Sequence, residues 1–413
     1  MKLPTVTQLR LRLRQNQTLR LIIGSLVFVV LCLSGYFIYS SNVEQTRLSQ
    51  DLTEKNQVVG QLQAKLGQTE QQLALVASEA AALKSEDQYV KNQQLQLEIG
   101  EIRKGYLATV KTYEEILDVR SDGAKVQTLE DSFAKVLTQL GKQQFASASA
   151  TLTELNKAVA LERSKLAEAQ APIPSNVPVS NTAPGSGSSK QTVSTDAGQF
   201  VVDLVAGDLN STRVQVETAS ESSCGDNCPV SSLADFVGKS GGYAGINGPY
   251  FCPASYPSCA GKTNSFDTLL MNKHKVFFNS DNNVYSTVPA LVFSGSGARI
   301  MKSAEVGRDG GADAVIASQP ALVWGGEVVF GGDGDPKKGS RGNRSFIAVK
   351  DSTVYIGVVR SATVAETARV MKALGMQHAL NLDSGGSTAL MVNGKYLAGP
   401  GRQTPFGIVL VRK

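Results

Sequence analysis

One segment near the C-terminus, residues 381–388, combines a carboxylate with flexible backbone and hydroxyl groups. Asp383 follows a short apolar run, and Gly385 and Gly386 come directly before Ser387. Glycine allows the backbone to approach a ligand closely and to adopt positive φ angles. A carboxylate beside backbone N–H groups and hydroxyls at a strand end is typical of a binding or catalytic site. An ordinary glycine turn after a strand is the alternative interpretation.

A second segment, residues 243–252, places Asn247 and Gly248 shortly before Tyr250. An asparagine amide can hydrogen-bond sugar hydroxyls, and an aromatic ring can pack on the apolar face of a sugar. The alternative is a turn pinned by a disulfide.

Two arginines stand at the ends of predicted strands. Arg344 enters a strand, where its guanidinium could hold a phosphate or carboxylate through two parallel hydrogen bonds. Arg360 ends another strand and is available to an anion, while Thr363 and Glu366 form a capping box for the helix that follows. A surface charge at a strand end is the simpler interpretation of Arg344.

The chain has only two histidines, His274 and His378. A Ser-His-Asp hydrolase or a multi-histidine metal site is therefore not expected, and catalysis would depend on carboxylates, arginine, asparagine and hydroxyls. No cofactor is required. Asp333 and Asp335 could bind Ca²⁺, although a solvated turn explains them more simply.

The N-terminus predicts a membrane anchor. A basic tail, residues 1–20, precedes an uncharged apolar run at residues 21–39, and Glu44 and Asp51 follow it. About 19 residues at about 1.5 Å each span the ~30 Å hydrocarbon core. The positive-inside rule puts the tail in the cytoplasm and the remainder outside a cell membrane crossed once. A cleaved signal peptide is the alternative, but Tyr39 stands where cleavage needs a small residue.

Cysteine usage agrees with an extracytoplasmic location. Apart from Cys32 in the anchor, the cysteines fall within one short exported region, and we expect the local disulfides Cys224–Cys228 and Cys252–Cys259. The spacings fit a four-thiolate zinc site poorly. The net charge of +5 indicates no nucleic-acid partner, because much of it lies in the basic tail.

The region between the anchor and the C-terminal half is predicted to be helical. Apolar residues at alternating three- and four-residue spacings across residues 44–92 predict a coiled coil, and therefore a homodimer. Residues 93–170 predict a small antiparallel helical module without site chemistry, with turns at residues 121–123 and 141–142. Residues 171–199, rich in Pro, Ser and Gly, predict a flexible linker.

Residues 200–413 have the pattern of an α+β domain, with many short strands and few helices. The chain as a whole is thus an α+β catalytic-type domain preceded by a transmembrane helix, a coiled coil and a helical module. The strands are predicted at residues 200–205, 213–217, 290–293, 314–316, 321–323, 327–330, 345–349, 353–359, 389–392 and 407–411, and the helices at residues 230–239 and 363–374.

Together these motifs resemble the phosphodiester glycosidase family. The matching segments are Gly-Ile-Asn-Gly-Pro-Tyr-Phe at residues 245–251, Arg-Ser-Phe at residues 344–346 and Asn-Leu-Asp-Ser-Gly-Gly-Ser-Thr at residues 381–388. The resemblance covers residues 200–413. One departure within it is Ser384, which stands where the family usually has glycine.

The resemblance implies a hydrolase that cleaves a sugar from a glycosyl-1-phosphodiester. Together with the predicted anchor, it predicts a membrane-anchored enzyme that acts on envelope or extracellular glycans. It implies that Asp383 and Arg344 are catalytic, with Arg344 holding the phosphate. The substrate would also contact Asn247, Gly248, Tyr250, Arg360, Gly385, Gly386 and Ser387. A second carboxylate is not identified, and Glu366 and Asp267 are weak candidates. A non-catalytic glycan-binding module and a coiled-coil envelope scaffold are the alternatives.

Overall fold

A computed structural model describes residues 17–85, 87–168, 174–307 and 311–413. Most of the predicted basic tail and the first residues of the predicted linker lie outside the described residues. The chain forms two units, Met1–Glu98 and Ile99–Lys413, which are described separately.

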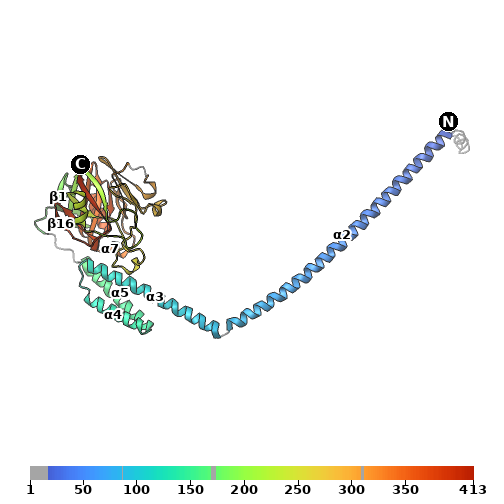
Figure 1. Cartoon of the computed structure of the whole chain (residues 1–413), viewed down its shortest axis with the longest axis horizontal. Helices are drawn as coiled ribbons and strands as arrows, with labels where there is room; N and C mark the ends of the chain where they lie inside the picture. Colours follow the sequence, from blue (N-terminus) through green and yellow to red (C-terminus); the bar gives the residue numbers. More distant parts are fainter. Residues whose placement is uncertain (1–16, 86, 169–173, 308–310) are drawn as a thin grey trace. The chain divides into compact units, whose positions relative to one another are not determined.

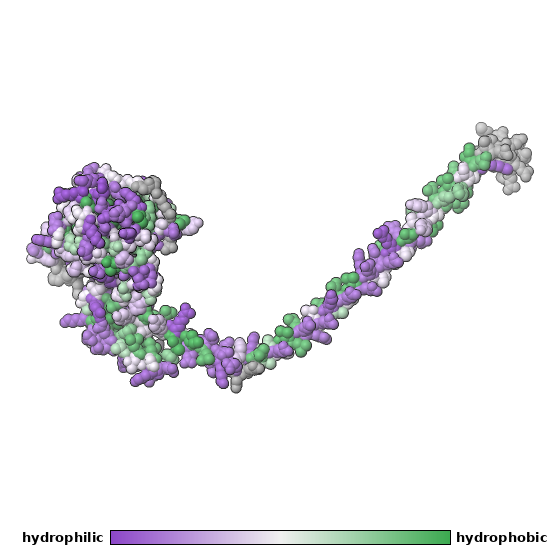
Figure 2. All heavy atoms as spheres, viewed as in Figure 1, coloured by the Kyte–Doolittle hydropathy of each residue, from purple (hydrophilic) through white to green (hydrophobic). Residues whose placement is uncertain are grey.

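The first unit is dominated by the long helix α2 (Gln17–Ser85), shown in Figure 1. By length and composition this helix could cross a membrane, and a signal sequence meets the same criterion. Its apolar stretch lies near its N-terminal end (Figure 2). Farther along, the apolar side chains of the predicted coiled coil are exposed: Leu62 is 59% and Leu66 is 60% accessible. The homodimer stays a prediction.

The helical module of the second unit contains the C-terminal part of α3 (Asp87–Ser121), α4 (Gln127–Gly141) and α5 (Phe145–Glu168). Both predicted turns are present, and Gly123 in the first has a φ of 102°. Buried Ile116, Val136 and Leu155, one from each helix, form the core of the module. The predicted helices are therefore confirmed as far as Glu168, where α5 ends.

The remainder of the second unit is a mixed α+β domain with three sheets. Their strand orders are β1-β2-β13-β12-β14-β10-β11, β16-β15-β4-β17-β3 and β6-β5-β9-β7-β8. The strands are β1 (Gly187–Thr195), β2 (Gly198–Asp208), β3 (Thr212–Thr218), β4 (Ala244–Asn247), β5 (Leu270–Met271), β6 (Phe277–Phe278), β7 (Pro289–Ser294), β8 (Gly297–Lys302), β9 (Ala314–Ala317), β10 (Ala321–Trp324), β11 (Glu327–Val328), β12 (Gly342–Lys350), β13 (Thr353–Ala362), β14 (His378–Asn381), β15 (Leu390–Val392), β16 (Lys395–Ala398) and β17 (Phe406–Arg412).

The helices of this domain are α6 (Leu233–Ser240), the short α7 (Pro336–Gly339) and α8 (Val364–Ala373), with 3-10 turns η1 (Pro257–Cys259), η2 (Asp281–Asn283), η3 (Ser303–Glu305) and η4 (Gly385–Ser387). The predicted capping box starts α8: the Glu366 N–H donates to Thr363 Oγ1 at 3.1 Å, and the Thr363 N–H donates to Glu366 Oε2 at 2.8 Å. Apolar residues of α8 pack on the first sheet and those of α6 on the second. The main core joins residues from all three sheets.

The linker prediction is wrong from Gly187 onward, because β1 occupies that part. β1 pairs antiparallel with β2 through a tight hairpin in which Gly198 has a φ of 125°. Val193 of β1 is fully buried. The composition rich in Pro, Ser and Gly hid a short β-prone run, Gln-Thr-Val-Ser-Thr, which pairs well with a neighbouring strand. The domain therefore begins before the predicted residue 200.

Candidate functional site

A cavity of about 490 Å³ lies where several of the predicted site residues meet. This volume falls in the range of small-molecule sites, roughly 300–1,000 Å³. The predicted residues that line it are Arg344 near the start of β12, Tyr250 after β4, and Asp383, Gly385, Gly386 and Ser387 after β14. β12 and β14 are antiparallel neighbours, so the start of one lies beside the end of the other.

Asp383 is held by its main chain. Its N–H donates to the carbonyl of Gly248 at 3.2 Å, and its carbonyl accepts from Asn247 Nδ2 at 2.6 Å. Its carboxylate Oδ1 accepts from the Ser384 N–H at 2.9 Å. These bonds tie the segment after β14 to the segment after β4, which fixes the carboxylate at the cavity wall.

The surroundings of Asp383 favour its protonated form. Burial raises its pKa from 3.8 to about 6. A hydrogen bond from Ser387 and the positive charge of Arg402 act in the opposite direction, whereas the charge of Asp267 raises the pKa further. A carboxyl group that titrates near neutral pH can exchange protons efficiently in a reaction.

Arg344 is a buried cation, with 7% of its surface accessible. Its Nε donates to the carbonyl of Ala362 at 3.0 Å, and its Nη2 donates to the carbonyl of Lys337 at 2.8 Å and to Ser340. Within the described part of the chain it forms no ion pair. Because neutral acceptors orient the guanidinium without neutralising it, the cavity wall carries a fixed positive charge suited to an anion.

Tyr250 adds a hydroxyl group beside the two charges. Its oxygen accepts a hydrogen bond from Asn381 Nδ2 at 2.5 Å. Burial, and then the nearby charge of Asp383, raise its pKa above the usual value for tyrosine. The phenol is therefore neutral at ordinary pH and its proton can be donated to a ligand.

The backbone after Asp383 explains which glycines are required. Gly385 has a φ of +59°, a conformation that side chains disfavour. At Gly386 a Cβ atom would lie 2.4 Å from Nη2 of Arg402, at the flexible end of that side chain, so a shift of Arg402 would accommodate it and glycine is not required there. Ser384, by contrast, is extended, with φ −136° and ψ −168°. This departure from the family pattern therefore places no strain on the site.

Three predicted substrate contacts are corrected by the structure: Asn247, Gly248 and Arg360 do not line the cavity. Asn247 is 1% accessible and its amide is engaged by protein groups on both sides. Gly248 packs against Phe406, where a Cβ would come within 2.1 Å of the ring. Arg360 donates to Asp203 Oδ2 at 2.6 Å. The groups that bond these three residues come from distant parts of the chain, and a short sequence motif does not reveal them.

The suggested second carboxylate Glu366 and the suggested calcium site are also corrected. Glu366 pairs with Arg341 and caps α8. Asp333 and Asp335 both pair with Lys338. Among the described residues, no cluster of three or more His, Cys, Asp or Glu side chains could hold a metal ion. Asp267, the other weak candidate, does line the cavity.

Both predicted disulfides, Cys224–Cys228 and Cys252–Cys259, are present, so these thiols are not zinc ligands. The second disulfide lies in the cavity wall.

Sequence reasoning missed several cavity residues, above all Arg402, Tyr256 and Asp122. The Arg402 side chain lies 5.7 Å from the Tyr256 ring, a cation–π contact. The Asp-Gly turn of the helical module was visible in the sequence as a turn, but nothing there connected it with a site.

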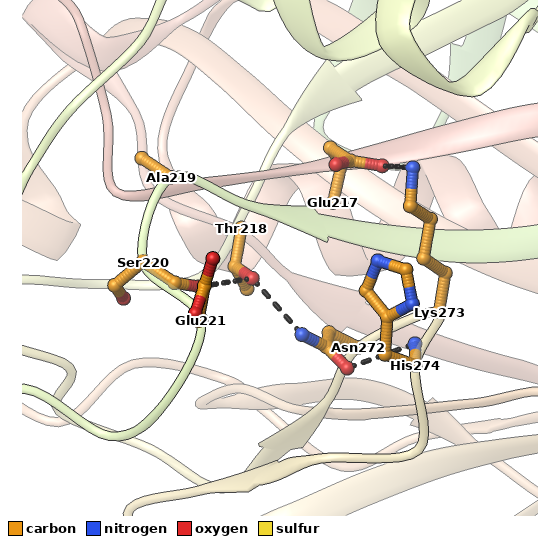
Figure 3. A pocket seen from close by; sticks show the side chains of 8 residues that line it. All are labelled: Glu217, Thr218, Ala219, Ser220, Glu221, Asn272, Lys273 and His274. Atoms are coloured by element: carbon orange, nitrogen blue, oxygen red, sulfur yellow. Dashed lines mark hydrogen bonds and ion pairs between the residues drawn. The ribbon is translucent and has the colours of Figure 1, made fainter.

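Another pocket lies away from these motifs, between the end of β3 and residues 272–274 (Figure 3). Two of its charged groups are already paired, because Lys273 Nζ lies 2.7 Å from Glu217 Oε2. Asn272 Nδ2 donates to Thr218 Oγ1 at 3.1 Å. These contacts join β3 to the third sheet and give the pocket a structural role.

Residues 240–411 match the family model described as phosphodiester glycosidase. The family resemblance read from the motifs is therefore confirmed for the C-terminal part of the chain. No curated protein matches the chain.

Among solved structures, the chain is similar to a hypothetical protein from Synechocystis, with 12% identity and a TM-score of 0.38, over 55% of this chain and 62% of that one. It thus spans less than two thirds of that protein. It is also similar to the zebrafish N-acetylglucosamine-1-phosphodiester alpha-N-acetylglucosaminidase catalytic domain auto-inhibited by its pro-peptide, with 12% identity and a TM-score of 0.43, over 57% and 87% of the two chains. At this distance neither structure assigns a substrate.

Proposed function

We propose that the protein is a hydrolase that cleaves the bond between the anomeric carbon of a sugar and a phosphodiester. The observation that carries this proposal is the meeting of two groups in one cavity: a buried Arg344, whose hydrogen-bond partners among the described residues are neutral, and a protonatable Asp383. The family match supports the same reaction class. The leaving group, a phosphate monoester, is a stable anion and needs less protonation than a sugar alkoxide.

In the proposed mechanism, Arg344 binds the phosphate through the side of its guanidinium that faces the cavity. Asp383 acts at the anomeric carbon, either as a base that activates water or as the nucleophile. The hydroxyls of Ser387 and Tyr250 bind the sugar. Backbone N–H groups of Gly385 and Gly386 supplement the positive charge.

We further propose that α2 anchors the protein in a cell membrane, with the hydrolase outside the cytoplasm. The apolar helix supports the anchor, and the two disulfides support an oxidising compartment. The exposed apolar seam of α2 supports a parallel dimer through a coiled coil. The substrate would then be a glycan phosphodiester of the envelope or of the surroundings of the cell.

The test uses the full chain in detergent with a panel of sugar α-1-phosphate methyl diesters, beginning with N-acetylglucosamine. We expect free sugar and methyl phosphate in equal amounts. Asp383→Asn should lower kcat about 100-fold or more. Arg344→Lys should weaken catalysis strongly, because lysine cannot make the bonds to Ala362 and Lys337 that orient the charge and also present a further donor to the phosphate.

Arg360→Lys is the matched control for Arg344→Lys, since Arg360 is ion-paired outside the cavity. Equal effects of the two substitutions would count against the assigned cavity. Tight glycan binding without release of sugar would indicate a binding module instead. Neither binding nor release across the panel would favour a scaffold.

A further inference from the structure

The helical module contributes to the wall of the cavity. Ser121 at the end of α3, Asp122 in the turn that follows and Arg163 of α5 line it together with Arg344 and Asp383. These helical residues lie far outside the matched family region, residues 240–411. The candidate site is therefore composite, made from two parts of the second unit.

Several polar contacts hold α3 against the rim of the cavity. The Ser258 N–H donates to Glu114 Oε1 at 2.9 Å, and the Tyr256 hydroxyl bonds the carboxylate of Asp118. Lys337 Nζ lies 2.9 Å from Asp118 Oδ2. The contacts reach both the disulfide loop and α7, so the turn that follows α3 is held from two sides.

Two glycines of the α+β domain leave room for the turn. A Cβ atom at Gly385 would lie 3.1 Å from Ser121 Oγ and 3.4 Å from Asp122 Oδ1. A Cβ atom at Gly342 would lie 3.2 Å from the same Asp122 oxygen. The Asp122 carboxylate therefore fits closely between the start of β12 and the segment after Asp383.

The electrostatic surroundings of Asp122 suit a proton donor. Burial raises its pKa from 3.8 to about 6. The charges that face it act on the pKa in both directions: Arg344 and Arg163 lower it, and Asp118 raises it. A phosphate monoester has its second pKa at about 6, so donor and leaving group are matched for proton transfer.

We propose, on the basis of the hydrolase function proposed above, that Asp122 is the second catalytic carboxylate and protonates the leaving phosphate oxygen. As the bond from the anomeric carbon to that oxygen breaks, the proton passes from Asp122 to the oxygen. In the direct route, water forms the new bond to the anomeric carbon and gives its proton to Asp383. In the other route, Asp383 first forms an ester with the anomeric carbon; water then displaces Asp383 and gives its proton to Asp122, which has already lost its own. Arg344, beside Asp122, holds the phosphate at that position.

Asp335 and Asp267 are the carboxylates to compare. Asp335 lines the cavity and its charge acts on Arg344, but it is paired with Lys338, which makes it a poor proton donor. Burial raises the pKa of Asp267 as well, but its charge acts on Asp383 and not on Arg344. A donor to the leaving group must lie beside the phosphate site. Asp122 meets this requirement because its charge interacts with Arg344.

The test compares Asp122→Asn with Asp131→Asn in the full chain, on the best diester from the panel. Asp131 is an exposed aspartate of the same helical module, so it controls for the loss of one charge there. We expect Asp122→Asn to lower kcat/KM at pH 6 by about 100-fold or more. We also expect it to remove the decline of kcat/KM on the alkaline side of the pH profile. Asp131→Asn should leave both unchanged.

Asp122→Glu keeps a carboxyl proton donor. We expect this variant to recover part of the activity that Asp122→Asn loses, and to show the alkaline decline of kcat/KM again. A fall in rate with the alkaline decline intact would overturn the proposal, since a merely structural role does not move a pH profile. A gain in rate for Asp122→Asn would also overturn it, because the turn would then obstruct the cavity. If the wild type is active and Asp122→Asn is equally active, the proposed role of Asp122 is refuted while the hydrolase function stands. A wild type inactive on every diester refutes the hydrolase function itself.

Discussion

Replacing Asn247 with alanine tests whether this residue positions Asp383 or binds substrate. The Asn247 amide takes part in four hydrogen bonds, to the carbonyls of Gly248 and Asp383, the hydroxyl of Ser345 and the N–H of Ala389. At about 1 kcal/mol each, their loss in a buried place should lower the free energy of unfolding by about 3–4 kcal/mol.

The effect on activity should be selective. Without the bond from Asn247, the carbonyl of Asp383 loses its 2.6 Å partner and the carboxylate is less well placed. Because Asn247 does not line the cavity, we expect kcat to fall at least 10-fold while KM changes little.

Unfolding in urea can be followed by the fluorescence of Trp324, the only tryptophan of the chain. It lies in β10, which pairs with β14, the strand that leads to Asp383. Asn176→Ala, at an exposed position of the same unit, is the control. A loss of stability below about 1 kcal/mol, or a raised KM with unchanged kcat, would refute the positioning role.

Three further predictions concern the cavity wall. Arg402→Gln removes a charge that lowers the pKa of Asp383, so the acid side of the kcat/KM profile should move up by about one pH unit; an unmoved profile would contradict this. Ser384→Gly should keep activity within a few-fold and cost about 1 kcal/mol in urea unfolding, because the extended backbone there does not need glycine. Replacing Cys252 and Cys259 together with serine should lower stability by about 2.5 kcal/mol, whereas Cys224 with Cys228 provides a comparison outside the cavity.

Much of the α+β domain could be predicted because its signals are local. The alternation of apolar residues located the strands, and the Thr363 capping box located α8. Arg344 and Asp383 stood out for the same reason, since each is a charge at the end of an apolar strand. β1 was missed because its few β-prone residues lie in a segment dominated by Pro, Ser and Gly.

The roles of other residues could not be predicted because they depend on distant partners. Asn247 has a side chain that suits a sugar, yet its amide is satisfied by residues of β12, of the position just before β15 and of the segment after β14. Arg360 could serve an anion, yet Asp203 already neutralises it. An inspection of one segment finds polar groups but does not tell which of them are already bonded.

The composite cavity also decides which form of the protein can test the hydrolase function. A chain cut at Phe200, the boundary that the sequence predicts, would lack β1 and expose the edge of β2. It would also lack Asp122 and the other helical residues of the cavity wall. The polar contacts that hold the helical module are individually weak, about 0–1 kcal/mol for an exposed ion pair. A helical module added as a separate chain would thus bind poorly. Asp122, Arg344 and Asp383 all belong to the second unit, Ile99–Lys413, so an inactive fragment that begins at Phe200 would say nothing about the reaction.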